Sequence, residues 1–223
     1  MTEAHNIDCM EAMAQMKDNA FELAIVDPPY GINAADDNRF GISTDKAASK
    51  RKDYNKKDWD ISPPDESYFK ELFRVSKNQI IWGVNYYTDG FFFGGRIYWD
   101  KGVPDNYTKS AGEIAYKSFG YGVDSVKIVW HGMLQQNMKN KEHRIHPTQK
   151  PVALYKWLLK NYAKEGDRIL DTHLGSGSSR IAAYDMGFDF VCYEIDKDYY
   201  EAQEKRFKHH IQHQTLFEPK EMY

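Results

Sequence analysis

Cysteine is scarce in this chain. Cys9 and Cys192 are the only two among 223 residues, too few for the disulfide framework that stabilises small secreted domains. No stretch of about 18 apolar residues occurs, and the first residues lack the basic and then apolar plan of a secretory signal. We therefore expect a soluble, cytoplasmic protein whose two thiols act as small buried groups.

An excess of basic residues is also absent. The chain has 30 Lys and Arg against 33 Asp and Glu, a formal net charge of −3. This balance excludes a uniformly basic surface but not a local patch that binds phosphates. The eight histidines show no spacing typical of metal ligands, and His209, His210 and His213 fit the exposed face of a tail helix better than a zinc site. We expect no metal.

A carboxylate, two prolines and an aromatic ring follow the apolar run 21–26. The run predicts a buried strand, and Asp27, Pro28, Pro29 and Tyr30 stand at its carboxyl end, where open α/β sheets keep their ligands and reactive groups. The alternative is a strand that simply ends in a proline-rich turn, because proline fixes φ and removes a backbone donor.

A glycine-rich turn lies far downstream. A predicted strand over 167–171 ends in Asp171, and Gly175 and Gly177 follow before a helical pattern begins; such a turn lets a ligand approach the backbone at a helix N-terminus. A second apolar strand then ends at Glu194, about 20 residues on, where βαβ nucleotide units place the acid that binds ribose hydroxyls. The third glycine of the pyrophosphate pattern is missing, which disfavours a pyrophosphate cofactor.

Strand and helix patterns alternate along the chain, without an internal repeat or a low-complexity tract. They predict one α/β domain with a doubly wound, mostly parallel sheet and an antiparallel hairpin at one edge. The segment 33–60 has few apolar residues and is predicted to be a long, mobile loop. Besides the strands that end at 26, 171 and 193, we expect strands at 7–9, 79–83, 95–99, 111–117 and 126–130 and helices near 10–16, 64–76, 152–162, 180–184 and 198–213.

These motifs, with the hexapeptide 146–151, resemble the S-adenosylmethionine-dependent amino-methyltransferases of DNA that act on adenine N6 or cytosine N4. In their permuted beta class the catalytic tetrapeptide precedes the cofactor turn, as it does here, and the resemblance covers about residues 7–200. It implies a seven-stranded Rossmann-like methyltransferase sheet, S-adenosylmethionine as cofactor and double-stranded DNA as substrate. It divides the single domain 1–223 into a catalytic half at about 5–130, a target-recognition segment 131–145, a cofactor half at about 146–200 and a tail 198–223.

The resemblance implies a catalytic role for the tetrapeptide. The exocyclic amine of a base is a poor nucleophile, since its lone pair is delocalised into the ring. Asp27 and the carbonyl of Pro28 would accept its two N–H bonds, and acceptors placed in advance stabilise the charge that develops. The base must leave the duplex, and Tyr30 would stack on it, with Phe40 or another aromatic on the second face. Asp27 favours adenine, because the cytosine enzymes more often carry Ser.

The resemblance also implies a set of cofactor-binding residues. Gly175 and Gly177 would pass close to the methionine part, Asp171 would meet its amino group and Glu194 the ribose. Asp8 matches an acid near the adenine ring, although a solitary Asp after a strand is as often a helix cap. Thr148 and Pro151 have a structural alternative too, as cap and first turn of the next helix. The remaining residues assigned to the cofactor are Thr148, Gln149, Lys150 and Thr172.

Two segments are candidates for contact with DNA. The basic run in 33–60 would bind phosphates and close over the duplex, and amides and cations in 131–145 would contact bases and phosphates. The alternatives are a solvated linker and an ordinary polar loop. The resemblance further allows a homodimer, which no pattern in the chain indicates. The DNA-binding candidates are Lys50, Arg51, Lys52, Lys56, Lys57, Gln135, Gln136, Lys139 and Arg144.

Other activities stay open at this point. Cytosine-N4 transfer uses the same logic. Methylation of RNA or of a protein glutamine is disfavoured, because those relatives usually carry Asn in place of Asp27 and reverse the motif order. A nucleic-acid-binding module without catalysis is disfavoured by two complete motifs.

Overall fold

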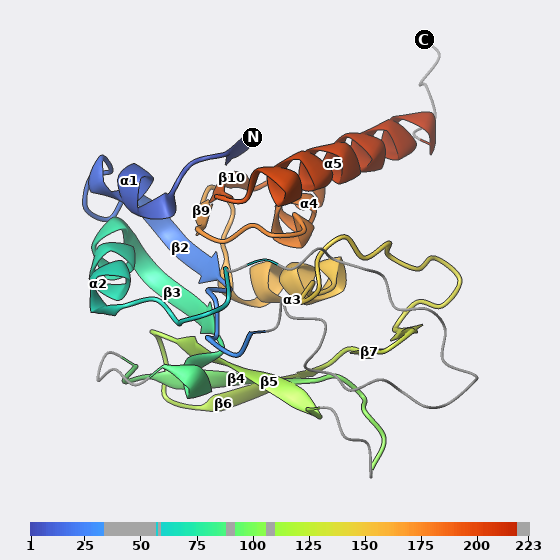
Figure 1. Ribbon diagram of the computed structural model, residues 1–223, viewed down its shortest axis with the longest axis horizontal. Helices are drawn as coiled ribbons and strands as arrows, with labels where there is room; N and C mark the ends of the chain where they lie inside the picture. Colours follow the sequence, from blue (N-terminus) through green and yellow to red (C-terminus); the bar gives the residue numbers. More distant parts are fainter. Residues whose placement is uncertain (34–56, 58, 88–91, 106–109, 218–223) are drawn as a thin grey trace.

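One mixed sheet organises the part of the chain that the computed structural model describes, residues 1–33, 57, 59–87, 92–105 and 110–217. Eight strands lie in the order β1-β10-β9-β2-β3-β5-β4-β6 (Figure 1). The elements are β1 (Thr2–His5), α1 (Cys9–Ala14), β2 (Phe21–Val26), α2 (Glu66–Val75), β3 (Ser76–Trp82), η2 (Val84–Tyr86), β4 (Gly95–Asp100), β5 (Gly112–Lys117), β6 (Val123–Lys127), β7 (Trp130–His131), β8 (Leu134–Gln135), α3 (Val152–Tyr162), β9 (Arg168–Asp171), α4 (Ser178–Asp185), β10 (Asp189–Tyr193) and α5 (Lys197–Phe217).

The predicted mostly parallel α/β sheet with an antiparallel hairpin is confirmed. In the sheet as described, β5 runs antiparallel to both β3 and β4, and every other pairing is parallel. The expected number of seven strands is wrong, because eight are paired. The hairpin also lies inside the sheet, since β6 pairs in parallel with β4 and covers its outer side.

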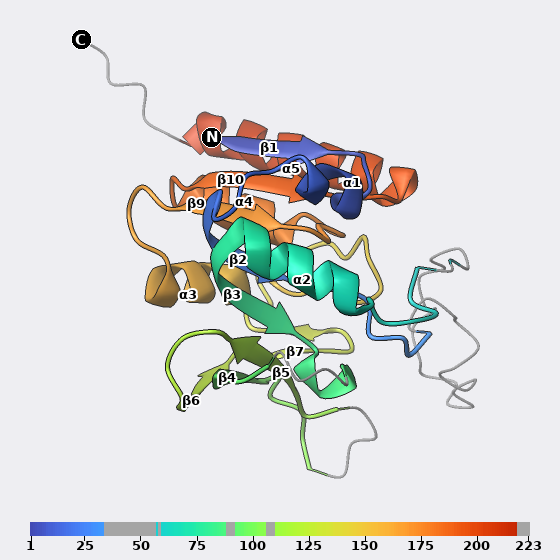
Figure 2. The same cartoon turned by 90° about the vertical axis from the view of Figure 1, so that its left-hand side faces the viewer.

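Helices cover both faces of the sheet, as a doubly wound fold requires. Along β2, Leu23 and Ile25 pack in a buried cluster with residues of α3 and α4, while Ala24 and Val26 pack in a second cluster with residues of α1 and α2. The two layers are visible on either side of the strands (Figure 2), with α5 packed against α4. Burial on both faces explains why residues 23–26 of β2 are continuously apolar rather than alternating.

The first strand lies outside the predicted range 7–9. Strand β1 instead spans Thr2–His5 and pairs with β10. Asp8 has extended backbone and its side chain accepts a hydrogen bond from the backbone N–H of Met10 at 2.8 Å, so it is the N-cap of α1. Because Asp8 caps α1, residues 7–9 form the entry to this helix and cannot form the predicted strand.

The other boundaries follow the predictions to within a few residues, with one difference at α3. Thr148 does not cap this helix; Pro151 holds the N-cap position, and the backbone N–H of Val152 donates to Glu142 at 3.0 Å. In the part of the chain that is described, no helix is long and apolar enough to cross a membrane.

The direction of winding changes between β2 and β9. The chain proceeds from β2 to β3 on one side and from β9 through β10 on the other, and β2 and β9 pair in parallel. Their carboxyl ends therefore meet at a switch point, where open α/β sheets leave a crevice for ligands. Asp27 follows β2 and Asp171 ends β9, so the two sequence motifs converge there.

Candidate active site

Asp27 lies in a row of buried charges. Its Oδ2 is 2.5 Å from Nζ of Lys150, and its Oδ1 accepts a hydrogen bond from the hydroxyl of Tyr30 at 2.7 Å. Nζ of Lys150 is also 3.0 Å from Oε2 of Glu113 in β5, and Glu113 pairs in turn with Lys101. The row alternates negative and positive charge from the catalytic turn into the sheet.

The charges in this row shift one another's ionisation. Burial raises the pKa of Asp27, with Lys150 opposing and Glu113 adding to the rise. Burial would also raise the pKa of Glu113, but Lys150 and Lys101 together lower it to about 2. The two carboxylates outweigh the burial of Lys150 and raise its pKa. Glu113 is therefore the firmly ionised acid, and Asp27 the acid whose charge depends on Lys150.

The sequence did not single out Glu113, and it placed Lys150 with the cofactor. Glu113 comes near Asp27 only because β5 inserts between β3 and β4, with Glu113 opposite Trp99. The ammonium of Lys150 contacts the catalytic turn instead, where it also donates to the hydroxyl of Tyr30 at 3.0 Å.

The rest of the tetrapeptide is held by its neighbours. The Tyr30 ring stacks on Tyr86, with centroids 4.8 Å apart and planes 15° from parallel. A Cβ at Gly83 would lie 2.1 Å from Cε1 of Tyr30, so glycine is needed there for the ring to approach. The carbonyl of Pro28 accepts a hydrogen bond from the hydroxyl of Tyr87 at 3.1 Å. Phe40, the expected partner for the base, lies outside the described residues.

The glycine turn after β9 is tied to the acid after β10. Gly175 and Gly177 have φ of +52° and +75°, which glycine adopts without strain. The backbone N–H of Gly175 donates to Oε2 of Glu194 at 2.7 Å, and that of Asp196 donates to Oε1 at 2.9 Å. Each oxygen keeps a lone pair for another donor. Burial raises the pKa of Glu194.

Asp171 lies beneath this turn. Its two oxygens accept hydrogen bonds from the backbone N–H of His173 at 3.0 Å and from the hydroxyl of Ser179 at 2.6 Å. Burial raises its pKa to about 7, because these two bonds favour the carboxylate less than desolvation disfavours it. Thr172 shares a 2.7 Å hydrogen bond with Tyr68, and the charge of Asp8 reaches His173, so both predicted residues lie beside the turn.

The segment 146–150 reaches both motifs. The ring of His146 would be 3.7 Å from a Cβ on Gly175, and it packs on Tyr199 with centroids 4.3 Å apart. Thr148 shares a 3.1 Å hydrogen bond with this ring, whereas the side chain of Gln149 is bound to the backbone of Ile145 at 2.9 Å. Burial lowers the pKa of His146 to about 3, so the ring is neutral.

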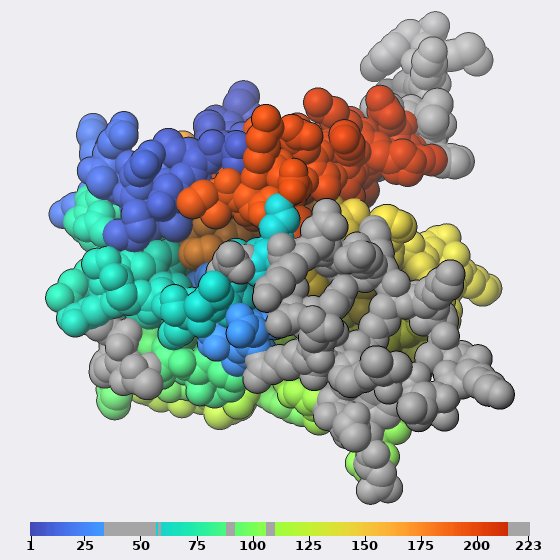
Figure 3. All heavy atoms as spheres, viewed as in Figure 1, coloured from blue at the N-terminus to red at the C-terminus, as the bar shows by residue number. Residues whose placement is uncertain are grey.

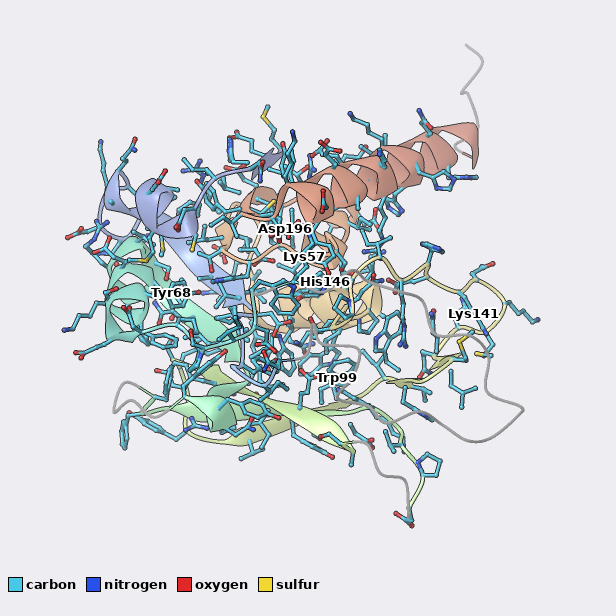
Figure 4. All side chains as sticks on the ribbon, viewed as in Figure 1. Lys57, Tyr68, Trp99, Lys141, His146 and Asp196 are labelled. Carbon is cyan, nitrogen blue, oxygen red and sulfur yellow. The ribbon has the colours of Figure 1, made fainter. Side chains whose placement is uncertain are left out.

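A strap formed by residues 57 and 59–60 joins the two motifs. Nζ of Lys57 lies 2.9 Å from Asp196 and 2.5 Å from Asp198, which follow Glu194. Trp59 packs on His146, and Oδ1 of Asp60 accepts the backbone N–H of Tyr30 at 2.7 Å. Cyan atoms from this part of the chain touch the orange-red start of α5 in Figure 3, and Figure 4 shows Lys57 beside Asp196.

The predicted DNA-binding residues fall into three groups, of which the last lies in the segment 131–145. Lys50, Arg51, Lys52 and Lys56 lie outside the described residues. Lys57 is paired with carboxylates in the strap, as described above.

The segment 131–145 is braced by its own polar side chains. The Gln135 amide bonds both backbone groups of Glu142, at 2.8 and 2.9 Å, and the side chain of Gln136 accepts the N–H of Val129 at 3.0 Å. Arg144 lies over the Trp130 ring, 4.3 Å from its centroid. Lys139 is exposed, and Lys141 lies on the outer part of this loop (Figure 4).

Comparisons with known proteins agree with these motifs. A family model described as DNA methylase matches residues 120–205. The type II methyltransferase M2.DpnII of Streptococcus pneumoniae is 26% identical, with 90% of this chain and 87% of that protein covered. M.HpaI of Haemophilus parainfluenzae is 23% identical, with 89% and 72% covered. These similarities confirm the predicted resemblance to DNA amino-methyltransferases.

Two solved structures share the fold of this chain. The crystal structure of an M1.HpyAVI–SAM complex matches with a TM-score of 0.55 and 18% identity, covering 92% of this chain and 100% of that one. The PvuII cytosine-N4-specific DNA methyltransferase matches with a TM-score of 0.62 and 13% identity, covering 92% and 86%.

The residues at the glycine turn of this protein fit S-adenosylmethionine. Gly175 in the turn before α4 is only partly buried, Glu194 keeps free lone pairs for hydroxyl donors, and Asp171 supplies a carboxyl group beside the turn. The carboxylate of Asp27 stands across the switch point, close enough to act on the charge of Asp171. The arrangement can hold a methyl donor on one side and an amine acceptor on the other.

Proposed function

We propose that this methyltransferase transfers a methyl group from S-adenosylmethionine to the N6 amine of adenine in double-stranded DNA. The observation that carries the proposal is the meeting of Asp27 and the glycine turn at the carboxyl ends of the paired strands β2 and β9. Asp27 in the tetrapeptide, in place of Ser, favours adenine over cytosine.

The amine would be activated by the catalytic turn. Asp27 and the carbonyl of Pro28 accept its two N–H bonds and leave the nitrogen lone pair free for the methyl group. The bound S-adenosylmethionine supplies an electrophilic methyl on a sulfonium centre. As the nitrogen–carbon bond forms, the carbon–sulfur bond would break and the sulfonium would leave as a neutral thioether. The nitrogen would carry a positive charge until it loses one of its protons. A fixed carboxylate stabilises that charge, and loss of one such contact costs about 3 kcal/mol.

Substrate entry requires a local rearrangement. Oδ1 of Asp27 accepts the Tyr30 hydroxyl and the Pro28 carbonyl accepts the Tyr87 hydroxyl, so an incoming amine would share or replace these donors. A base extruded from the duplex would also need an aromatic face. Tyr86, with 40% of its surface exposed beside Tyr30, can supply one.

DNA contact is proposed for the exposed part of the loop 131–145. Lys139 is free to meet a phosphate, and Gln136 is exposed although one of its acceptors is used by the loop. Gln135 and Arg144 would act indirectly, by fixing the loop's shape.

Identification of the methylated nucleoside tests the proposal. Duplex DNA is incubated with the protein and methyl-labelled S-adenosylmethionine, digested and separated into nucleosides. Label in N6-methyladenine is the expected result. Label in N4-methylcytosine would establish the alternative for which the PvuII enzyme, with its shared fold, gives a precedent. Absence of label from every nucleoside, while the parent protein binds the cofactor, would overturn the function.

A further inference from the structure

Lys150 is an almost completely enclosed charge at the catalytic turn. Only 2% of its side-chain surface is exposed. Its ammonium has three donors, and the structure provides three acceptors: Asp27 at 2.5 Å, Glu113 at 3.0 Å and the Tyr30 hydroxyl at 3.0 Å. The cation is therefore oriented in three directions and has no donor left for a cofactor or a phosphate.

We propose that Lys150 and Glu113 are positioning residues for methyl transfer: Lys150 keeps Asp27 as the carboxylate that faces the amine, and Glu113 fixes Lys150 in place. The proposal rests on the function proposed above, and it moves Lys150 from the cofactor site to the acceptor side.

The backbone around Lys150 supports such a fixed role. The preceding carbonyl, that of Gln149, accepts the indole N–H of Trp130 at 2.7 Å, and α3 begins just after Lys150. The rings of Tyr30 and Trp82 flank the ammonium, with centroids 5.4 and 5.5 Å away. Helix, indole and rings leave the side chain little freedom to point elsewhere.

Glu113 matters because one ammonium faces two carboxylates. If Lys150 were the only cation, Asp27 and Glu113 would compete for it, and like charges this close favour protonation of one acid. Lys101 provides Glu113 with a second cation. Glu113 can then stay ionised without taking Lys150 away from Asp27. Its only remaining effect on Asp27 is that its own negative charge raises the pKa of that acid.

A protonated Asp27 could not do the proposed work. A neutral carboxyl group uses one oxygen as a donor and no longer offers a negative charge to the amine. Among the described residues, the groups whose charges interact with Asp27 include Lys150 and Glu113, the acid Asp171, and the hydroxyls of Tyr30, Tyr68, Tyr87 and Tyr155. In the described part of the chain, Lys150 is the cation that contacts Asp27, so its removal should raise the pKa of Asp27.

The test compares variants that should move Asp27 in opposite directions. Lys150→Met removes the cation and should raise the pH midpoint of Asp27 by about 1 to 3 units. Glu113→Gln removes the repelling charge and should lower it. The midpoint is measured in the free protein from the carboxyl carbon resonance assigned with Asp27→Asn, and again as the acidic limb of the pH profile of kcat. A purely structural role would shift both variants alike or neither.

Controls keep the outcome independent of folding and of the proposed function. Lys127→Met removes an exposed cation on the edge strand β6, paired with Asp100 at 3.5 Å, and should leave the midpoint unchanged. Lys150→Arg keeps the charge and should keep the midpoint while lowering kcat, since the guanidinium cannot reproduce the three contacts. If Lys150→Met fails to fold, the downward shift in Glu113→Gln decides the matter.

The two proposals fail separately. An inactive parent protein would remove the methyl-transfer function, but the resonance midpoints would still report the electrostatic relationship. An active parent whose Asp27 midpoint is the same in Lys150→Met, Glu113→Gln and the parent would overturn the positioning role alone.

Discussion

Asp60 binds the catalytic turn from a distant part of the chain: its Oδ1 accepts the backbone N–H groups of Tyr30 at 2.7 Å and of Gly31 at 2.9 Å. The Asp60 residue is only 2% exposed. Since Lys57 in the same strap is paired with acids beyond β10, the geometry of the catalytic turn is coupled to the cofactor side of the crevice.

Replacing Asp60 should therefore affect both stability and catalysis. Asp60→Ala leaves two backbone donors of the turn without their acceptor, which costs roughly 1–3 kcal/mol of unfolding free energy, and kcat should fall because Tyr30 and Asp27 lose their fixed placement. Urea unfolding and initial rates measure the two effects. Asp65→Ala is the matched control: it removes the N-cap of α2, costs about 1 kcal/mol and should leave kcat unchanged. Equal kcat in both variants would contradict the role given to Asp60.

Mutations in the two halves of the crevice should have different effects, one on methyl transfer and the other on cofactor binding. Asp27→Ala is expected to abolish methyl transfer and to leave S-adenosylmethionine affinity within a few-fold, because Asp27 acts on the amine. If calorimetry shows that this variant no longer binds the cofactor, Asp27 belongs to the cofactor half and its assignment to the amine is wrong.

Glu194 should show the opposite behaviour. Glu194→Ala is expected to weaken cofactor binding by roughly 1–3 kcal/mol, the cost of a lost charged hydrogen bond. Part of that loss would come from the glycine turn, since Glu194 also holds the N–H of Gly175. Glu194→Gln keeps an acceptor for Gly175 and isolates the charge. A dissociation constant equal to that of the parent in both variants would move the ribose contact elsewhere.

Features that depend on a local sequence pattern could be predicted, whereas features that depend on contacts between distant residues could not. Strands β2 and β9 were predictable, because an apolar run closed by Pro or Gly is a local pattern, and their parallel pairing follows from fold class. The position of Glu113 beside Asp27 was not predictable, since it depends on the pairing order β3-β5-β4. The strap was equally hidden, because Lys57 meets Asp196 and Asp198 from 139 and 141 positions away.

Lys150 shows a subtler limit. His146 and Lys150 belong to one hexapeptide, and the prediction placed that segment at the cofactor. In the structure His146 lies beside Gly175, whereas Lys150 contacts Asp27. Residues a few positions apart in an irregular segment can face opposite sides of a crevice, which sequence spacing outside a helix or strand does not reveal. The cofactor and DNA contacts assigned from the sequence remain predictions.

Cofactor binding should release a proton near neutral pH. The pKa of Asp171 is raised to about 7 in the free protein, so Asp171 is largely protonated at pH 6. A cationic amino group at the turn would favour its carboxylate and expel the proton. Calorimetry at pH 6 in buffers of different ionisation enthalpy should show this release, and affinity should fall as the pH drops below about 7. Asp171→Asn should remove both effects; an unchanged proton release would assign it to another group.

The same shift predicts the pH dependence of stability. Because the folded pKa of Asp171 lies above its ordinary value of 3.8, the protonated form stabilises the free protein. That contribution is fully present below about pH 4 and is lost as the pH rises through about 7. Asp171→Asn should therefore raise Tm at pH 8 and leave it nearly unchanged at pH 4. A uniform shift of Tm at both values would contradict the ionisation of Asp171 as its source.

Lys57 and Lys139 should differ in their effect on DNA binding, although the sequence assigned both to the phosphate backbone. Lys139 is exposed, whereas the ammonium of Lys57 is already held by two carboxylates. Each cation that meets a phosphate contributes about −0.9 to the slope of log affinity against log salt concentration. Lys139→Ala should therefore flatten the slope by about 1, while Lys57→Ala should leave the slope unchanged and alter cofactor affinity through the strap. Titrations of labelled duplex at several salt concentrations measure the slopes, and calorimetry measures the cofactor. A flatter slope in Lys57→Ala, with cofactor affinity equal to that of the parent, would show that Lys57 leaves Asp196 and Asp198 for DNA and would restore its original assignment.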